Sequence, residues 1–159
     1  MLHRLKQQGL SARVYEAGDD LGGTWYWNRY PGARCDIPSM EYSYQFSDEL
    51  QQEWQWSERY ATQAEILKYA NHVAERFDLR RDIQFNTRVN AAHFDEKDTL
   101  WQVELSGGAR VSARYVIMAT GCLSVPNYPN IKGLQDFPGN VYHTGQWPRE
   151  GADLVGKRV

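Results

Sequence analysis

Two segments near the start of the chain carry residues that could bind a nucleotide. Glu16 ends a short predicted strand at 12–16, and a carboxylate at the end of a strand can accept hydrogen bonds from the two ribose hydroxyls of a dinucleotide. On position alone, a solvated glutamate is an equally good interpretation. Gly22 and Gly23 follow. Adjacent glycines let backbone amides approach a phosphate or a planar ring, whereas a glycine turn packed by core aromatics is the alternative.

The residues after this glycine pair combine aromatic and charged side chains. The run Thr-Trp-Tyr-Trp at 24–27 could form the wall of an apolar pocket. A Pro-Gly turn then precedes Arg34, Cys35 and Asp36. Arg34 and Asp36 either form a structural ion pair, which their spacing favours, or Asp36 holds a second, distant arginine beside a developing oxyanion.

A third segment, residues 137–148, reads F-x-G-x-x-x-H-T-x-x-W-P. Its histidine, His143, could be a base, a pH switch or a packing residue at a hinge, although a single histidine in a loop is most often a structural hydrogen bonder. Trp147 and Pro148 could anchor a linker between domains. The pattern fixes six positions, so it is more specific than the glycine pair.

Composition excludes several classes of function. The chain has 159 residues, enough for about one domain. Its net charge of −2 without a basic block argues against nucleic-acid binding, and no apolar run reaches the ~20 residues that cross a bilayer. The start is too polar for a secretion signal, which favours a cytoplasmic protein. Cys35 and Cys122 are predicted to be free thiols, and the four histidines lack metal-ligand spacing, so no metal is expected.

Hydrophobic periodicity and glycine positions predict the elements that carry these residues. A hairpin turn is expected at Gly107 and Gly108, and Gly9 is expected to end the first helix. The predicted helices are 1–8 and 62–78; the predicted strands are 12–16, 83–85, 88–94, 100–105, 110–119 and one beginning at 157–159; the predicted loops are 18–38 and 123–153.

The order of these elements predicts an α/β fold. A helix, a turn and a strand that ends in Glu16 form the second half of a βαβ unit. The strand 110–119 begins with alternating residues and ends in a continuous apolar run, so we expect it to start in an exposed antiparallel sheet and end in a buried parallel one. The sequence therefore predicts an incomplete Rossmann-like domain with a parallel sheet and a small antiparallel β-meander.

Residues 22–39 and 137–148 resemble motifs of the Baeyer–Villiger monooxygenases, class B flavin-dependent monooxygenases of the phenylacetone and cyclohexanone type. The resemblance implies an enzyme that uses FAD, NADPH and O2 to insert one oxygen atom beside a ketone carbonyl, which gives an ester or lactone. It also implies three regions: a partial FAD-binding domain at 1–136 that lacks its first strand and GxGxxG turn, an interdomain linker at 137–156, and the start of an NADPH-binding domain at 157–159.

The resemblance also assigns roles to individual residues. Asp36 is the catalytic candidate, because in the family this carboxylate supports an active-site arginine, which lies outside these 159 residues. The implied cofactor-binding residues are Glu16, Gly22, Gly23, Thr24, Trp25, Tyr26, Trp27, Arg34, Cys35, Asp36, Tyr42, Val89, Thr120, Gly121 and Cys122. The implied linker residues, which couple domain movement to NADPH binding, are Phe137, Gly139, His143, Thr144, Trp147 and Pro148.

Two other functions stay open at this point. One is a flavin monooxygenase that oxygenates nitrogen or sulfur. The pair Trp147-Pro148 favours the ketone-oxygenating enzyme over this alternative. The other is a catalytically inert FAD-binding fragment. We expect residues 1–159 to be inactive alone and marginally stable or insoluble, because the strands at 12–16 and 115–119 would each lack a neighbouring strand.

Overall fold

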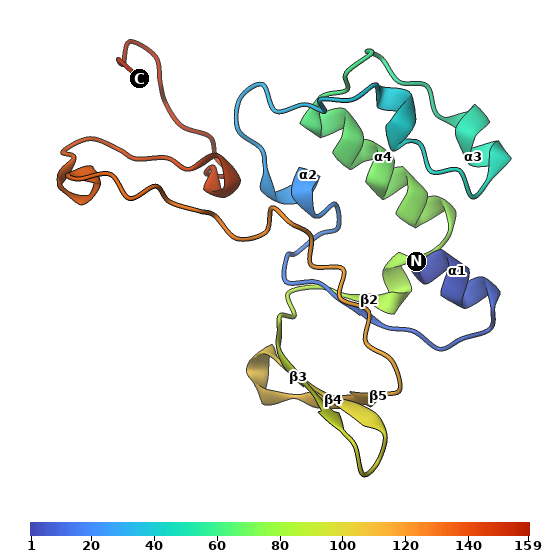
Figure 1. The fold of residues 1–159 in the computed structure, drawn as a ribbon. Coiled ribbons are helices and arrows are strands. Elements are labelled where there is room, and N and C mark those ends of the chain that lie inside the picture. The colour runs from blue at the N-terminus through green and yellow to red at the C-terminus, as the bar shows by residue number, and fades with distance from the viewer. The chain divides into compact units, whose positions relative to one another are not determined.

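A computed structural model describes residues 1–159 (Figure 1). The chain divides into two compact units, each made of two stretches of sequence. The first unit contains Met1–Leu21 and Asn71–Thr120, and the second contains Gly22–Ala70 and Gly121–Val159. No helix has the length and apolar composition that crossing a membrane requires.

The first unit holds one short helix and both sheets. The strands β1 and β2 pair in parallel, and β3, β4 and β5 form an antiparallel meander. These are the parallel sheet and the small antiparallel sheet that the sequence predicts, so the fold class is confirmed. The elements are α1 (Leu2–Gln7), β1 (Val14–Tyr15), η2 (Arg80–Asp82), β2 (Ile83–Gln84), β3 (Val89–Asp95), β4 (Leu100–Leu105), η3 (Ser106–Gly108) and β5 (Arg110–Ala113).

Helix α1 ends where the glycine signal predicts. Gly9 has φ +70°, and its N–H donates to the Lys6 carbonyl at 2.9 Å. The N–H of Leu10 donates to the Leu5 carbonyl at 3.0 Å. This pair of bonds is the Schellman arrangement, which satisfies the last carbonyls of a helix and favours glycine at the left-handed position.

The hairpin between β4 and β5 is also confirmed. Gly107 and Gly108 have φ of +81° and +83°, and the N–H of Leu105 donates to the Ala109 carbonyl at 2.8 Å across the turn. Val103 and Leu105 are buried, which gives β4 one apolar face.

The strand predicted at 110–119 is shorter in the structure, where β5 ends at Ala113. The apolar residues that follow are exposed: Tyr115 at 84%, Ile117 at 55% and Met118 at 79%. No strand among residues 1–159 pairs with 115–119, and a strand needs such a partner for its backbone hydrogen bonds. The strand predicted to begin at 157–159 is not formed either, for the same reason.

The second unit contains short helical turns, the first half of α4 and a long loop segment at 121–159. Its elements are α2 (Thr24–Trp27), η1 (Ser39–Tyr42), α3 (Asp48–Glu53), α4 (Gln63–Arg76, which continues into the first unit), η4 (Leu134–Asp136) and η5 (Thr144–Gln146). The predicted helix 62–78 is confirmed as α4. Its buried residues Ile66, Tyr69, Val73 and Ala74 follow the predicted i, i+3/i+4 stripe.

Two helices lie where none was predicted. The interval 18–38 was expected to be a loop, yet it contains α2, a single turn that follows Gly23. The six residues of α3 begin after Ser47, whose Oγ accepts the Leu50 N–H at 3.2 Å, and Leu50 is fully buried. Both helices are too short for periodicity to reveal them, because stable helices of this length depend on packing and caps.

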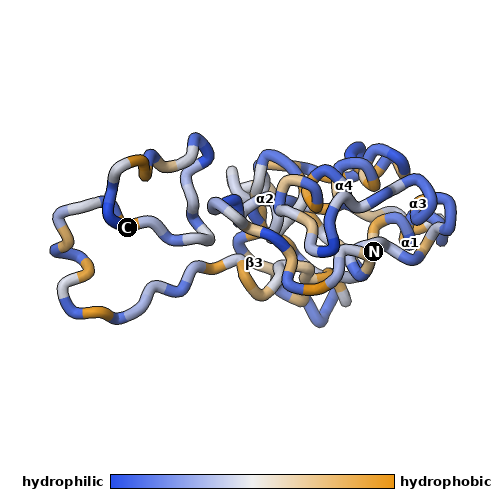
Figure 2. The backbone as a smooth tube through the Cα atoms, turned by 90° about the horizontal axis from the view of Figure 1, so that it is seen from above, coloured by the Kyte–Doolittle hydropathy of each residue, from blue (hydrophilic) through white to orange (hydrophobic).

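Residues 121–159 form a loop, as predicted for 123–153, which contains only the short turns η4 and η5. Hydrophobic and hydrophilic residues alternate along it without a lasting run of either kind (Figure 2). Several of its apolar side chains are exposed, among them Ile131, Phe137 and Val155.

Candidate functional site

The glycine pair of the second unit sets the start of α2. Gly22 has φ +124° and Gly23 has φ +51°, both in the region that favours glycine. A Cβ at Gly22 would overlap with Cδ1 of Leu67 on α4. A Cβ at Gly23 would meet no atom within 4 Å, so the backbone there faces open space.

The aromatic run after the glycines is divided between core and surface. Tyr26 is 4% exposed, whereas Trp27 is 42% exposed. The guanidinium groups of Arg29 and Arg149 lie 5.0 and 5.1 Å from the centre of the Tyr26 ring, within the range of cation–π attraction. Tyr26 is therefore a core residue, as expected for a glycine turn packed by core aromatics. Trp27 is the most accessible aromatic residue of this run.

The segment 33–39 is tied by its backbone to residues 59–63. The N–H of Cys35 donates to the Ala61 carbonyl at 3.0 Å, and the N–H of Gln63 donates to the Ala33 carbonyl at 2.9 Å. Further along, the N–H of Ser39 donates to the Arg59 carbonyl at 2.7 Å. These bonds hold both ends of a short arch, residues 35–39, against the opposing segment, residues 57–63.

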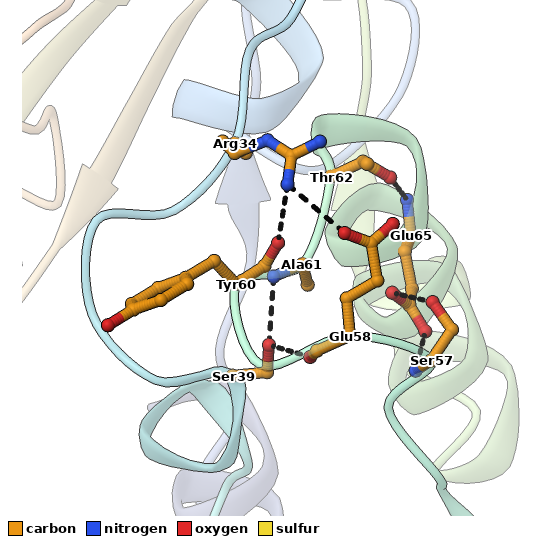
Figure 3. Close-up of polar contacts among 8 residues, drawn as sticks. All are labelled: Arg34, Ser39, Ser57, Glu58, Tyr60, Ala61, Thr62 and Glu65. Carbon is orange, nitrogen blue, oxygen red and sulfur yellow. Dashed lines mark hydrogen bonds and ion pairs between the residues drawn. The ribbon is translucent and has the colours of Figure 1, made fainter.

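Side chains reinforce this attachment (Figure 3). The Ser39 hydroxyl donates to the Glu58 carbonyl at 2.6 Å and accepts the Ala61 N–H at 2.8 Å. Arg34 Nη1 donates to Glu58 Oε2 at 3.1 Å and to the Tyr60 carbonyl at 3.4 Å. Arg34 thus forms its ion pair with Glu58, and the predicted structural pair between Arg34 and Asp36 is wrong. Glu58 lies on the opposing segment, which brings it within reach.

Four of the candidate residues come together beside this arch. Cys35 is 3% exposed and packs in a cluster against which Trp25 and Tyr42 also lie. The rings of Trp25 and Tyr42 meet edge to face at 5.6 Å. Burial raises the pKa of the Tyr42 hydroxyl, and the nearby Cys35 and Asp36 raise it further. Asp36 itself is exposed and directly follows Cys35, near enough to the Tyr42 hydroxyl to act on it electrostatically.

Among the candidate residues of the first unit, Glu16 lies at the end of the parallel strand β1. The Glu16 carboxylate accepts the Gly18 N–H at 2.7 Å, which makes a tight turn directly after β1. The Glu16 backbone N–H donates to the Gln84 carbonyl at 2.9 Å and continues the pairing of β1 with β2. Val89 begins β3 and is 43% exposed, and Thr120 is exposed.

In the segment 137–148, His143 has a structural hydrogen bond. Its Nδ1 accepts the Gly145 N–H at 3.0 Å and caps the turn Thr144–Gln146. The His143 ring also packs on Tyr128 at 4.8 Å. These contacts match the alternative in which the histidine is a hydrogen bonder.

The other residues of this pattern mostly contact one another. The Trp147 ring lies 5.3 Å from that of Tyr142. The Phe137 ring covers Gly139, where a Cβ would lie 2.7 Å from Phe137 Cε1. Gly121, which precedes this segment, has φ +75°, and its neighbour Cys122 is exposed.

Sequence reasoning missed Ser39 and Glu58 as residues that shape the site. Ser39 lies 19 residues from Glu58 and 22 from Ala61, so no local pattern reveals these bonds. The one available signal was the place of Ser39 inside the segment 22–39.

Comparison with known proteins agrees with the fold. Residues 28–155 match the family described as pyridine nucleotide-disulphide oxidoreductase. The chain is 49% identical over 159 residues to a Baeyer–Villiger monooxygenase of Pseudooceanicola batsensis, covering 99% of this chain and 29% of the relative. It is 43% identical to a phenazine N-monooxygenase of Lysobacter antibioticus, covering 100% of this chain and 29% of that protein.

A solved structure of OTEMO in complex with FAD and NADP has the same fold, with a TM-score of 0.86 and 45% identity. The match covers 95% of this chain and 29% of that one. The chain thus spans about 30% of the length of the proteins it matches. It belongs to the pyridine nucleotide-disulphide oxidoreductase family, and over almost its whole length it is homologous to part of the Baeyer–Villiger monooxygenases.

Proposed function

We propose that the protein containing this chain is an FAD- and NADPH-dependent monooxygenase that inserts one oxygen atom of O2 next to a ketone carbonyl to form an ester or lactone. The observation that carries the proposal is the 49% identity to a Baeyer–Villiger monooxygenase across 99% of the chain. The arrangement of residues 22–42 supports it, because an exposed carboxylate, Asp36, directly follows Cys35 of the buried cluster against which Trp25 and Tyr42 pack.

The residues present fit a flavin nucleotide. At Gly23 the backbone faces open space, so a phosphate or planar ring can approach it closely. Trp25, Trp27 and Tyr42 offer aromatic surface. Glu16 offers a carboxylate at the carboxyl end of a parallel strand, the edge at which doubly wound sheets bind nucleotides.

When bound, FAD would supply the redox chemistry, and NADPH would supply the electrons. The chain's own contribution is binding, orientation and exclusion of water. Glu16 would accept hydrogen bonds from ribose hydroxyls, and Arg34 and Cys35 would face the nicotinamide end of NADPH. Asp36 would fix the guanidinium of an arginine from elsewhere in the protein, and a positive charge held in place stabilises an anionic transition state better than a mobile one.

The remaining implied contacts belong to the same proposal. The cofactor would also touch Gly22, Thr24, Tyr26, Val89, Thr120, Gly121 and Cys122. We further propose that residues 1–136 contribute to the FAD-binding domain and that residues 137–156 act as the interdomain linker. The proposed substrate is a small ketone, and the proposed location is the cytoplasm.

Oxygenation of a heteroatom is the second candidate function. It is favoured by the phenazine N-monooxygenase of Lysobacter antibioticus, which is 43% identical to the chain over its full length. The site residues argued above bind and orient a cofactor, and they do not touch the substrate. They are therefore compatible with attack on nitrogen as well as on a carbonyl.

A substrate panel under ¹⁸O2 separates the two candidates. The full-length protein, supplied with FAD and NADPH, is offered linear, cyclic and aromatic ketones, sulfides, amines and N-heteroaromatics, and products are analysed by mass spectrometry. Labelled esters or lactones are expected. Labelled N- or S-oxides with ketones untouched would establish the second candidate, and NADPH consumption without any labelled product would contradict both.

A further inference from the structure

We propose that Ser39 is a positioning residue, whose buried hydroxyl clamps the arch that presents Asp36. The arch runs from Cys35 to Ser39, and its two ends are fixed on the same opposing segment. This inference rests on the proposed function, since it concerns how Asp36 is held for that reaction.

The Ser39 hydroxyl donates one hydrogen bond and accepts another. It donates to the Glu58 carbonyl at 2.6 Å and accepts the Ala61 N–H at 2.8 Å (Figure 3). Ser39 is 2% exposed and Ala61 is fully buried, so the Ala61 N–H has no ready access to water once the hydroxyl is removed. This buried donor would lose its partner together with the part-buried Glu58 carbonyl, which favours movement of the local backbone.

The geometry links that movement to Asp36. Ala61 contacts both ends of the arch. Its carbonyl accepts the Cys35 N–H at 3.0 Å at one end, and its N–H donates to the Ser39 hydroxyl at the other. Asp36 lies between these anchors and is exposed. Its own side chain has no part in the clamp, so its position is set by the backbone on either side.

The neighbouring ion pair does not supply the same restraint. Arg34 and Glu58 are about half exposed, with 48% and 50% of their side-chain surface accessible, and exposed pairs of this kind restrain the backbone weakly. Ser39 is therefore the side chain that fixes the arch.

The test uses the full-length protein and the variants Ser39→Ala and Ser57→Ala. Ser57 lies on the same opposing segment, and its hydroxyl bonds to Glu65 at 2.8 Å, away from the arch. The first readout is amide hydrogen exchange of the peptide 33–38. Ser39→Ala should speed its exchange on the order of tenfold or more, because opening of the arch no longer breaks the two hydrogen bonds of the Ser39 hydroxyl, whereas Ser57→Ala should leave it unchanged.

The second readout is product formed per NADPH consumed. Ser39→Ala should lower it on the order of tenfold through misplacement of Asp36. In the Asp36→Ala background the same substitution should cause no further loss, because both changes remove one effect. Ser39→Thr keeps a hydroxyl and should lie nearer the wild type in both readouts, which also provides a second variant if Ser39→Ala fails to fold.

The outcomes separate the two claims. Unchanged exchange of 33–38 in Ser39→Ala, or a loss of coupling that simply adds to that of Asp36→Ala, would overturn the positioning role. Absence of oxygenation by the wild-type protein would instead contradict the proposed function, and the exchange measurement would still decide whether Ser39 clamps the arch.

Discussion

The backbone of Gly22 lies against the side chain of Leu67, and a Cβ added at position 22 would lie 2.4 Å from Leu67 Cδ1, so that the leucine would have to move. This contact places the start of α2 on α4. The same residue has φ +124°, so its backbone conformation and its surroundings both require glycine.

Replacing Gly22 by alanine should therefore destabilise the protein by about 3 kcal/mol, as the sum of overpacking and backbone strain. Gly23→Ala is the matched control, because Gly23 also has positive φ but open space around it. It should cost about 1 kcal/mol from strain alone. Thermal unfolding of the full-length protein measures both, and equal shifts in Tm would show that Leu67 does not set the difference.

Glu16 has two separable tasks. Its carboxylate accepts the Gly18 N–H at 2.7 Å, and in the proposed function it also binds the ribose of FAD. Glu16→Gln keeps an oxygen for Gly18 but loses the charge, so FAD affinity should fall about tenfold with Tm of the FAD-free protein nearly unchanged. Glu16→Ala should lower both. Fluorescence of released flavin measures the affinity, and wild-type retention of FAD by both variants would exclude the ribose contact.

Asp36→Asn should reduce the rate of oxygenation on the order of a hundredfold, because the charge that holds the catalytic arginine is lost. The isosteric amide should leave FAD binding and Tm close to wild type. Glu41→Gln is the matched control, since Glu41 is an exposed carboxylate in the turn that follows the arch. The measurement is the steady-state kcat with a ketone substrate. Equal kcat values for the Asp36→Asn and Glu41→Gln variants would show that Asp36 has no role in the oxygenation.

The ion pair between Lys6 and Asp82 should give a pH-dependent stability. Lys6 Nζ lies 2.7 Å from Asp82 Oδ2, and the hydrogen bond from Lys6 is the main cause that lowers the pKa of Asp82 below its usual 3.8. A lowered pKa in the folded state means stability that is present above the unfolded value and lost as pH falls through the folded one.

Lys6→Met should consequently lower Tm at neutral pH, and its deficit should shrink as pH falls below 3.8. High salt should shrink the deficit as well. Lys68→Met, which alters an exposed lysine of α4, should show no such trend. A deficit that persists at acidic pH would indicate that Lys6 stabilises the protein through packing of its stem or through the hydrogen bond from its Nζ to the Asp78 carbonyl at 2.9 Å.

Elements that sequence reasoning found are those whose signals are local. The long apolar stripe of α4, with Ile66 and Tyr69, follows helical spacing, and Gly9 and the pair Gly107-Gly108 mark ends and turns through positive φ. The resemblance, too, depends on short motifs that are read directly from the sequence.

The features that the sequence did not predict correctly depend on partners that are distant along the chain. The apolar run after Ala113 reads as a strand, but a strand forms only beside another. Arg34 could pair with a near or a distant carboxylate, and the distant one, Glu58, is within reach because the two segments lie side by side. The role of Ser39 is invisible for the same reason.

The two cysteines of the chain should react with a thiol reagent at very different rates. Cys122 is exposed and should be modified at once, while Cys35 is buried and its N–H is bonded to Ala61. Modification of Cys35 must wait until its segment detaches from the facing one. The rate of the slow labelling phase then measures the rate of that detachment. A maleimide dye attached during the fast phase labels Cys122 and leaves the buried Cys35 unmodified.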